Sequence, residues 1–115
     1  FVSPDTLRDI FSRNGIGLFP TRWDSQGMLN GEAMSSGVVP ISNAVTAIPE
    51  FIGEAEGILA NPENSKQLAE GIGELVENPD QFLTMSESAQ VRVRNQCGPE
   101  MTVHREIDLF DNAYL

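Results

Sequence analysis

The chain has 115 residues, of which 40% are hydrophobic and 21% charged, the composition of an ordinary single domain. Its 17 acidic and 7 basic side chains give a formal net charge of -10, which argues against nucleic acid or an anionic membrane surface as partner. The lone Cys97 cannot form an internal disulfide, and no apolar run reaches the ~20 residues that span a bilayer. We therefore expect a cytoplasmic segment without membrane insertion.

The first 60 residues alternate between strand-like and helix-like patterns. Ser3 before Pro4 predicts the start of a helix, which ends at Asn14-Gly15. A turn-rich stretch at 21–27 is followed by a helix at 28–36, which ends before Gly37. Residues 44–53 are predicted to form a loop with one helical turn. Three apolar or β-branched runs too short for helices predict strands at 16–20, 38–42 and 57–60. The order of elements predicts a βαβ region over 1–60.

Residues 61–115 read as three helices. Asn64 with Gln67 resembles a capping box at the start of the first, and Asn78-Pro79 and Gly98-Pro99 separate it from the next two. Each helix has an apolar stripe at helical spacing. The stripes are Leu68, Ile72, Leu75 and Val76; Phe82, Met85, Ala89 and Val93; and Val103, Ile107 and Phe110.

Strands that alternate with helices predict an α/β fold with a parallel sheet. Three strands make a thin sheet, and the chain opens on the apolar pair Phe1-Val2, which reads as the end of a strand or connecting loop. We therefore expect residues 1–115 to be a single truncated domain with a partial Rossmann-like parallel sheet and flanking helices. An apolar edge or face of that sheet would be exposed and prone to self-association.

The stretch from Thr21 to Glu50 carries the chemistry. Asp24 and Glu32 are separated by seven residues, and Gly27 lies between them where the loop meets a helix. Glycine lets a backbone approach a ligand, a helix N-terminus offers free N–H groups to phosphate, and carboxylates accept hydrogen bonds from sugar hydroxyls. The loop is also expected beyond the carboxyl end of a strand, where open α/β sheets bind ligands. The acidic spacing alone carries little weight, because about two such pairs are expected by chance.

The context of these residues is more specific. Residues 24–40, DSQGMLNGEAMSSGVVP, align without gaps to the signature E-G-F-G-x-P-x-x-E-A-M-A-x-G-x-P-V. The stretch thus resembles retaining glycosyltransferases of the GT-B fold, in their C-terminal donor-binding domain. The family also has corresponding segments at the positions of Ile48-Pro49-Glu50 and of the strand candidate at 57–60. The resemblance therefore covers nearly the whole chain.

The resemblance implies roles for four residues. Glu32 would hold the ribose hydroxyls of a nucleotide-diphospho-sugar donor, and Asp24 would contact the donor sugar as the catalytic-site carboxylate. Backbone amides around Gly27 and Met28 would approach the sugar and diphosphate. The resemblance implies an acceptor domain elsewhere in the parent chain. It implies no metal or cofactor. Asp in place of the family's first Glu shortens the reach by about 1.5 Å, enough to break a hydrogen bond.

Two other readings remain open. The chain could be a non-catalytic GT-B-like nucleotide-binding or structural module, which the Asp at position 24 favours. Another α/β class, such as a response-regulator-like or epimerase domain, would need a cluster of acidic residues at strand ends or a G-x-G-x-x-G loop, and neither is present.

Five further residues have simpler readings. We expect an exposed ion pair for Arg22, a surface position for His104 and a buried or incidental thiol for Cys97. For Trp23, stacking on a base or sugar and packing of the loop are equally favoured. Glu50 falls in the family's ribose-side region, with capping of a helix N-terminus as the alternative.

Overall fold

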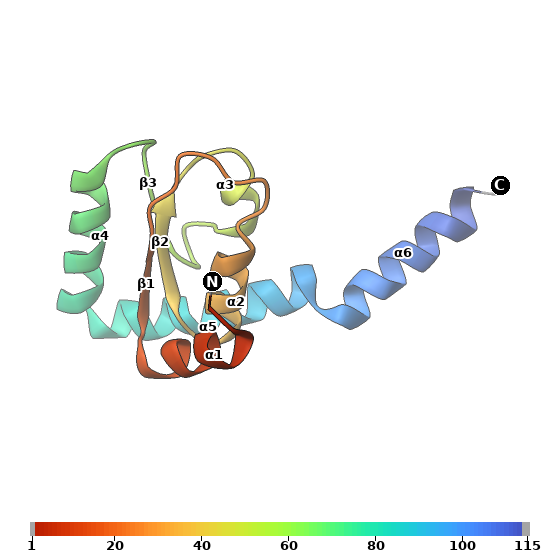
Figure 1. The fold of residues 1–115 in the computed structure, drawn as a ribbon, viewed down its shortest axis with the longest axis horizontal. Coiled ribbons are helices and arrows are strands. Elements are labelled where there is room, and N and C mark those ends of the chain that lie inside the picture. The colour runs from red at the N-terminus through yellow and green to blue at the C-terminus, as the bar shows by residue number, and fades with distance from the viewer. Residues whose placement is uncertain (1, 114–115) are drawn as a thin grey trace.

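A parallel sheet of three strands lies at the centre of the computed structural model, which describes residues 2–113. The strands β1 (Ile16–Phe19), β2 (Val39–Asn43) and β3 (Ile58–Ala60) lie side by side in chain order, with Ile16 opposite Val39 and Ile41 opposite Ile58 (Figure 1). All three predicted strands and their parallel pairing are therefore confirmed. The interpretation of Phe1 as part of a strand or loop lies outside the described residues.

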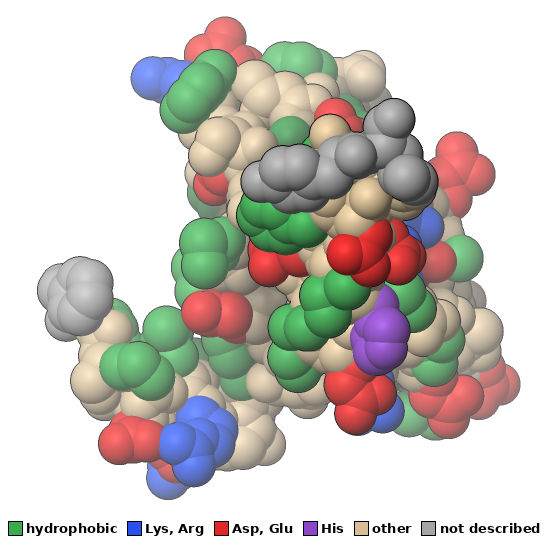
Figure 2. All heavy atoms as spheres, turned by 90° about the vertical axis from the view of Figure 1, so that its right-hand side faces the viewer, with side chains coloured by type: hydrophobic (Ala, Val, Ile, Leu, Met, Phe, Trp, Pro, Cys, Tyr) green, Lys and Arg blue, Asp and Glu red, His purple; other side chains and the backbone are tan. Residues whose placement is uncertain are grey.

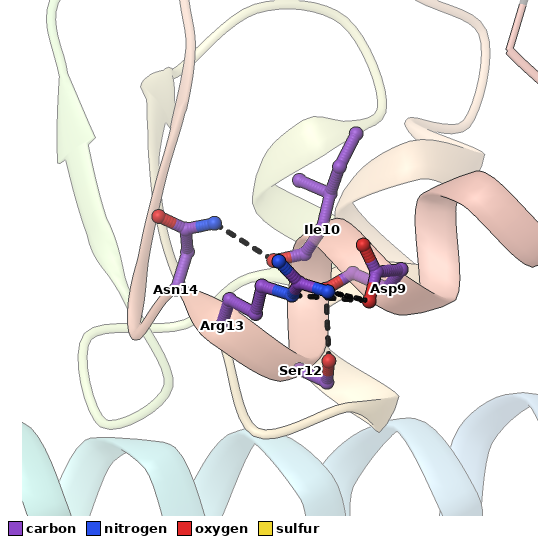
Figure 3. A network of polar contacts seen from close by, with 5 residues as sticks. All are labelled: Asp9, Ile10, Ser12, Arg13 and Asn14. Atoms are coloured by element: carbon purple, nitrogen blue, oxygen red, sulfur yellow. Dashed lines mark hydrogen bonds and ion pairs between the residues drawn. The ribbon is translucent and has the colours of Figure 1, made fainter.

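The helix α1 (Pro4–Arg13) precedes β1 and has well-defined ends. The Ser3 hydroxyl accepts a hydrogen bond from the Thr6 N–H at 3.2 Å, the N-terminal cap that the sequence predicts. At the other end Arg13 donates to Asp9, and the Asn14 side-chain amide donates to the Ile10 carbonyl at 2.7 Å (Figure 3). None of its residues is buried.

One face of the sheet packs against α2 (Met28–Ser35), and the single-turn helix α3 (Ile48–Phe51) joins the core on the same side. Their buried side chains pack together with Ala89 of a later helix, in a cluster of Met34, Val45, Ile48, Ile52 and Ala89. Leu59 of β3 points to this side, whereas its neighbours Ile58 and Ala60 point to the other, as strand alternation requires. The central strand β2 is buried along its whole length because both faces are covered.

The opposite face packs against α4 (Ser65–Glu77), in a cluster of Val39, Ile41, Ala60, Leu68 and Leu75. Leu68, Ile72 and Leu75 turn toward the sheet as predicted, but Val76 does not, since 67% of it is exposed. The capping box is only half formed. Asn64 accepts from the Gln67 N–H at 3.0 Å, but the Gln67 side chain accepts from the Asn61 N–H rather than from Asn64.

The helix α5 (Pro79–Cys97) runs across the bottom of Figure 1 and contacts both α2 and α4. Its predicted stripe is confirmed: Phe82 and Met85 join the α4 side of the core, and Ala89 and Val93 join the α2 side. The long helix thus ties the two layers of the domain together.

The last helix, α6 (Pro99–Ala113), projects away from the rest of the domain (Figure 1). Its predicted stripe faces solvent, since Val103, Ile107 and Phe110 are each more than half exposed and no described residue of α6 is buried. Figure 2, viewed from the side toward which α6 projects, shows hydrophobic side chains lying among acidic ones. No described helix is both long and apolar enough to cross a membrane. Leu18 of the edge strand β1 is 47% exposed, as expected for an uncovered sheet edge.

Candidate functional site

The candidate site lies at the carboxyl edge of the sheet, where the loop at 20–27 leaves β1. The buried Asn43 at the end of β2 connects this loop to the one after β3. Its side-chain oxygen accepts from the Thr21 N–H at 3.1 Å, and its side-chain nitrogen donates to the Asn61 carbonyl at 2.8 Å. Sequence reasoning missed Asn43, although an amide side chain that directly follows a buried strand is a usable signal.

Asp24 is half-buried and bonds to its own loop. One carboxylate oxygen, Oδ1, accepts from the backbone N–H groups of Gln26 at 3.0 Å and Gly27 at 2.6 Å. These two bonds, the first being the larger cause, lower the pKa of Asp24 below its usual value, because they stabilise the charged form. Asp24 is therefore a stably ionised carboxylate that closes an Asx turn at the entrance to α2.

Gly27 has the backbone conformation that only glycine adopts easily. Its φ of 74° and ψ of 46° place it in the left-handed region, and it forms the N-cap of α2. A Cβ atom there would lie 2.5 Å from Cδ1 of Ile48 and 2.8 Å from Nδ2 of Asn30. Met28, the first helical residue, is 68% exposed, and its N–H has no carbonyl partner within the helix. This helix start is open to solvent at Met28.

Glu32 lies one turn into α2 with an exposed side chain, on a ridge between two hollows. A groove of about 250 Å³ runs between α2, α3 and the end of α5, and a hollow of about 180 Å³ separates α2 from α1. Gly27, Met28 and Glu32 all line the larger groove, whereas Asp24 does not. Much of its remaining lining is apolar and comes from Met34 of α2, Phe51 of α3, and Val93 and Cys97 of α5.

The wall of this groove is held in place by side chains of α5. The guanidinium group of Arg92 donates to the backbone carbonyls of Glu50 and Phe51, each at 2.9 Å, and Gln96 donates to the same Glu50 carbonyl at 3.0 Å. Arg92 also lies 3.5 Å from the carboxylate of Glu56. The C-terminal carbonyls of α3 are thus satisfied by donors from α5, a long-range contact that spacing could not reveal.

Asn30 is a buried polar residue beneath Gly27. It is 4% exposed, and within residues 2–113 its Oδ1 has no hydrogen-bond partner. A buried acceptor without a donor costs about 1–3 kcal/mol. This acceptor is therefore expected to lower the free energy of unfolding.

Of the five residues for which the sequence predicts simpler roles, some lie as expected and others do not. Arg22 forms the expected exposed ion pair, with Glu63 at 3.0 Å, and His104 is on the surface. Trp23 is 73% exposed, so the prediction that it packs the loop is wrong and stacking on a ligand stays a prediction. Cys97 is exposed rather than buried. Glu50 is exposed in the first turn of α3, whose N-cap makes no side-chain bond.

Three solved structures share this fold. The chain superposes on HepE from Anabaena with a TM-score of 0.83 at 18% identity, covering 98% of this chain and 30% of HepE. For a sucrose-phosphate synthase from Thermosynechococcus elongatus the TM-score is 0.82 at 23% identity, covering 91% and 27%. For the C-terminal domain of the glycosyl transferase group 1 protein LpcC from Francisella tularensis it is 0.76 at 20% identity, covering 84% and 50%. The α/β fold is that of GT-B glycosyltransferase C-terminal domains.

Sequence comparison places the chain in one family. It is 38% identical over 71 residues to an uncharacterized 41.2 kDa protein in the cps region of Klebsiella pneumoniae, covering 61% of this chain and 20% of that protein. The chain thus spans about a fifth of this relative and at most half of the three structures above. Residues 1–92 match the family model of glycosyl transferases group 1. The chain belongs to the glycosyl transferases group 1 family.

Proposed function

We propose that this chain is the donor-binding segment of a retaining glycosyltransferase, within a longer protein that carries an acceptor domain. The reaction would transfer a sugar from a nucleotide-diphospho-sugar to a glycan or lipid acceptor. One observation carries the proposal: in a chain of this family, an open helix start behind the left-handed Gly27 shares a groove with the exposed carboxylate of Glu32. A helix N-terminus attracts phosphate, and a carboxylate one turn away can accept from ribose hydroxyls.

Two further facts favour this donor class. The structures of HepE are described as complexes with UDP and glucose and with UDP-glucose, and they share this fold. The Klebsiella relative is described by its place in a cps region, which fits polysaccharide biosynthesis. Because Cys97 is the chain's one cysteine and stays free, we place the reaction in the reducing cytoplasm.

The four residues then have distinct roles. Glu32 holds the ribose, the Met28 N–H faces the diphosphate, and Gly27 lets the backbone turn without a side chain in the way. Asp24 lies on the sugar side of the loop, and its second carboxylate oxygen is the group that would reach the donor sugar. Catalysis would come from electrostatic stabilisation of the departing diphosphate, without a covalent protein intermediate.

Calorimetric titration of the full-length protein tests donor binding. The probes are uridine, guanosine and adenosine diphosphates, and one of them is expected to bind. Glu32→Gln should then raise its Kd about tenfold or more, because charge-assisted hydrogen bonds to the ribose are lost. Glu87→Gln, which removes one charge from an exposed site on α5, serves as the matched control and should leave the Kd unchanged. Absence of binding by all three nucleotides in the unmodified protein refutes the proposal.

A non-catalytic role for the same fold is the second candidate, and one contact favours it. The Oδ1 atom of Asp24 is already occupied by two amides of its own loop, as in a purely structural turn. Asp24→Glu discriminates between the two. A gain in sugar transfer with unchanged nucleotide affinity supports a donor site weakened by the shorter side chain, whereas no change in transfer supports the structural role.

A further inference from the structure

Thr46 lies in the loop between β2 and α3 and reaches across to the loop that carries Asp24. Its hydroxyl accepts a hydrogen bond from the Asp24 N–H at 3.3 Å and donates one to the Asp24 carbonyl oxygen. A single side chain, 22 residues away in the sequence, thus binds both backbone polar groups of Asp24. The two loops at the carboxyl edge of the sheet are joined at this point.

The backbone of Thr46 is in an unfavourable conformation. Its φ of 46° lies in the left-handed region, where a β-branched residue is a rare outlier. Glycine would fit that backbone without strain, but glycine has no hydroxyl to bind Asp24. Strained residues persist where the surrounding structure holds them and are often found at binding sites. The strain and the hydroxyl contact therefore occur together at one residue next to the candidate site.

A continuous series of bonds leads from Thr46 to the helix start. Thr46 binds the Asp24 backbone, and the Asp24 carboxylate in turn accepts from the N–H groups of Gln26 and Gly27. Gly27 is the N-cap of α2, the helix that carries Met28 and Glu32 into the groove. Fixing Asp24 thus fixes the turn at 24–27 before a ligand arrives, which lowers the entropic cost of ordering this turn on binding. Met28 and Glu32 belong to the helix itself, so their positions depend much less on Thr46.

We infer that Thr46 is a positioning residue for the sugar side of the donor site, acting through Asp24 rather than by contact with the ligand. The inference rests on the proposed function, because it assigns Asp24 to the sugar and Glu32 to the nucleotide. It makes a specific prediction about two related ligands. Loss of the Thr46 hydroxyl should weaken binding of a nucleotide-diphospho-sugar while leaving the nucleoside diphosphate alone almost unaffected.

The experiment measures the Kd of UDP and of UDP-glucose for full-length variants by calorimetry, together with the melting temperature of each variant. Thr46→Ala and Thr46→Gly both lack the hydroxyl, and each should weaken UDP-glucose roughly tenfold and change UDP less than twofold. Thr46→Ser keeps the hydroxyl and should bind both ligands as the unmodified protein does. Thr46→Gly should melt at a higher temperature than Thr46→Ala, because only glycine fits the backbone at this φ.

A control separates relief of strain from loss of the clamp. Glu63 has a φ of 57°, the other positive value among the described non-glycine residues, and lies in the loop after β3. Glu63→Gly should relieve strain and also removes the ion pair with Arg22, but that pair is largely exposed and contributes little, so both affinities should stay unchanged. If affinity instead follows melting temperature across the four variants, or if both ligands weaken equally, the role of Thr46 is only structural and the inference is overturned.

A second readout keeps the inference separate from the proposed function. If the unmodified protein binds none of uridine, guanosine and adenosine diphosphates, the donor assignment fails, but hydrogen exchange of the 24–27 amides still tests the clamp. If guanosine or adenosine diphosphate binds instead of UDP, that nucleotide and its sugar conjugate replace UDP and UDP-glucose in the affinity measurements. Thr46→Ala should speed exchange at Gln26 and Gly27 about tenfold relative to Thr46→Ser. Equal exchange in the two variants overturns the clamp itself.

Discussion

Gly27→Ala is the change that most directly tests how the start of α2 is built. The new methyl group must adopt a φ of 74°, which costs an L-residue roughly 1–2 kcal/mol. It must also displace Cδ1 of Ile48 at 2.5 Å and Nδ2 of Asn30 at 2.8 Å. Both atoms are at the ends of side chains and can move, so overpacking adds about 1–2 kcal/mol rather than more. We expect a total loss of about 2–4 kcal/mol in the free energy of unfolding.

For a domain of this size each kcal/mol lowers the melting temperature by about 4 °C, so the expected shift is roughly 8–16 °C. Differential scanning calorimetry measures it directly. Gly73→Ala is the matched control, because Gly73 lies within α4 and a Cβ atom there would meet no atom within 4 Å. That variant should gain about 0.5–1 kcal/mol from better helix propensity. A Gly27→Ala protein as stable as the unmodified one would refute the account of this turn.

Two further predictions concern its neighbours. Asn30→Leu replaces a buried amide, whose Oδ1 has no donor among residues 2–113, by an apolar side chain of similar size. The variant should raise the free energy of unfolding by about 1 kcal/mol. Urea unfolding checks this, and a loss of stability would show that the amide has a partner in solution. The folded-state pKa of Asp24 is lowered, so its contribution to stability is complete above its unfolded pKa of about 3.9 and is lost as the pH falls through the lower folded value. Melting temperatures of the unmodified protein and Asp24→Asn should therefore differ most near neutral pH and converge toward pH ~2; a constant difference would mean that charge is not the cause of the effect.

Most of the fold could be predicted because its boundaries are marked by local chemistry. Ser3-Pro4, Gly37 and Asn78-Pro79 each restrict the backbone or supply a cap, and the structure begins or ends helices at or next to these residues. The burial of individual side chains was harder to predict, because a hydrophobic pattern in the sequence does not show which other element packs against it. Val76 matched the apolar stripe of α4 but is 67% exposed, and the three residues of the α6 stripe are each more than half exposed.

The candidate site was predictable in its residue types but not in its bonds. Three residues of the aligned signature, Gly27, Met28 and Glu32, line one groove because they lie within about two turns of the same helix start, and their roles toward a ligand stay predictions. The signature could not show that side chains outside it, those of Asn43, Arg92 and Thr46, form hydrogen bonds that hold the surrounding loops in place. Each of these residues bonds to backbone groups 18 or more positions away, and backbone groups have no sequence signature.

Asp24 shows why the position of a carboxylate and its role have to be argued separately. A longer Glu side chain would project its oxygens further from the loop, whereas the Asp carboxylate is short enough to close a turn on Gln26 and Gly27. The shorter Asp side chain, which on the proposed function would reach a donor sugar less well, supplies the acceptor for the two N–H groups of the turn. Thr46 fixes the Asp24 backbone from the other side. In Asp24→Glu the turn should loosen as the reach to the sugar improves. Stability and sugar affinity at this position are therefore expected to change in opposite directions, a relation that a purely structural carboxylate would not produce.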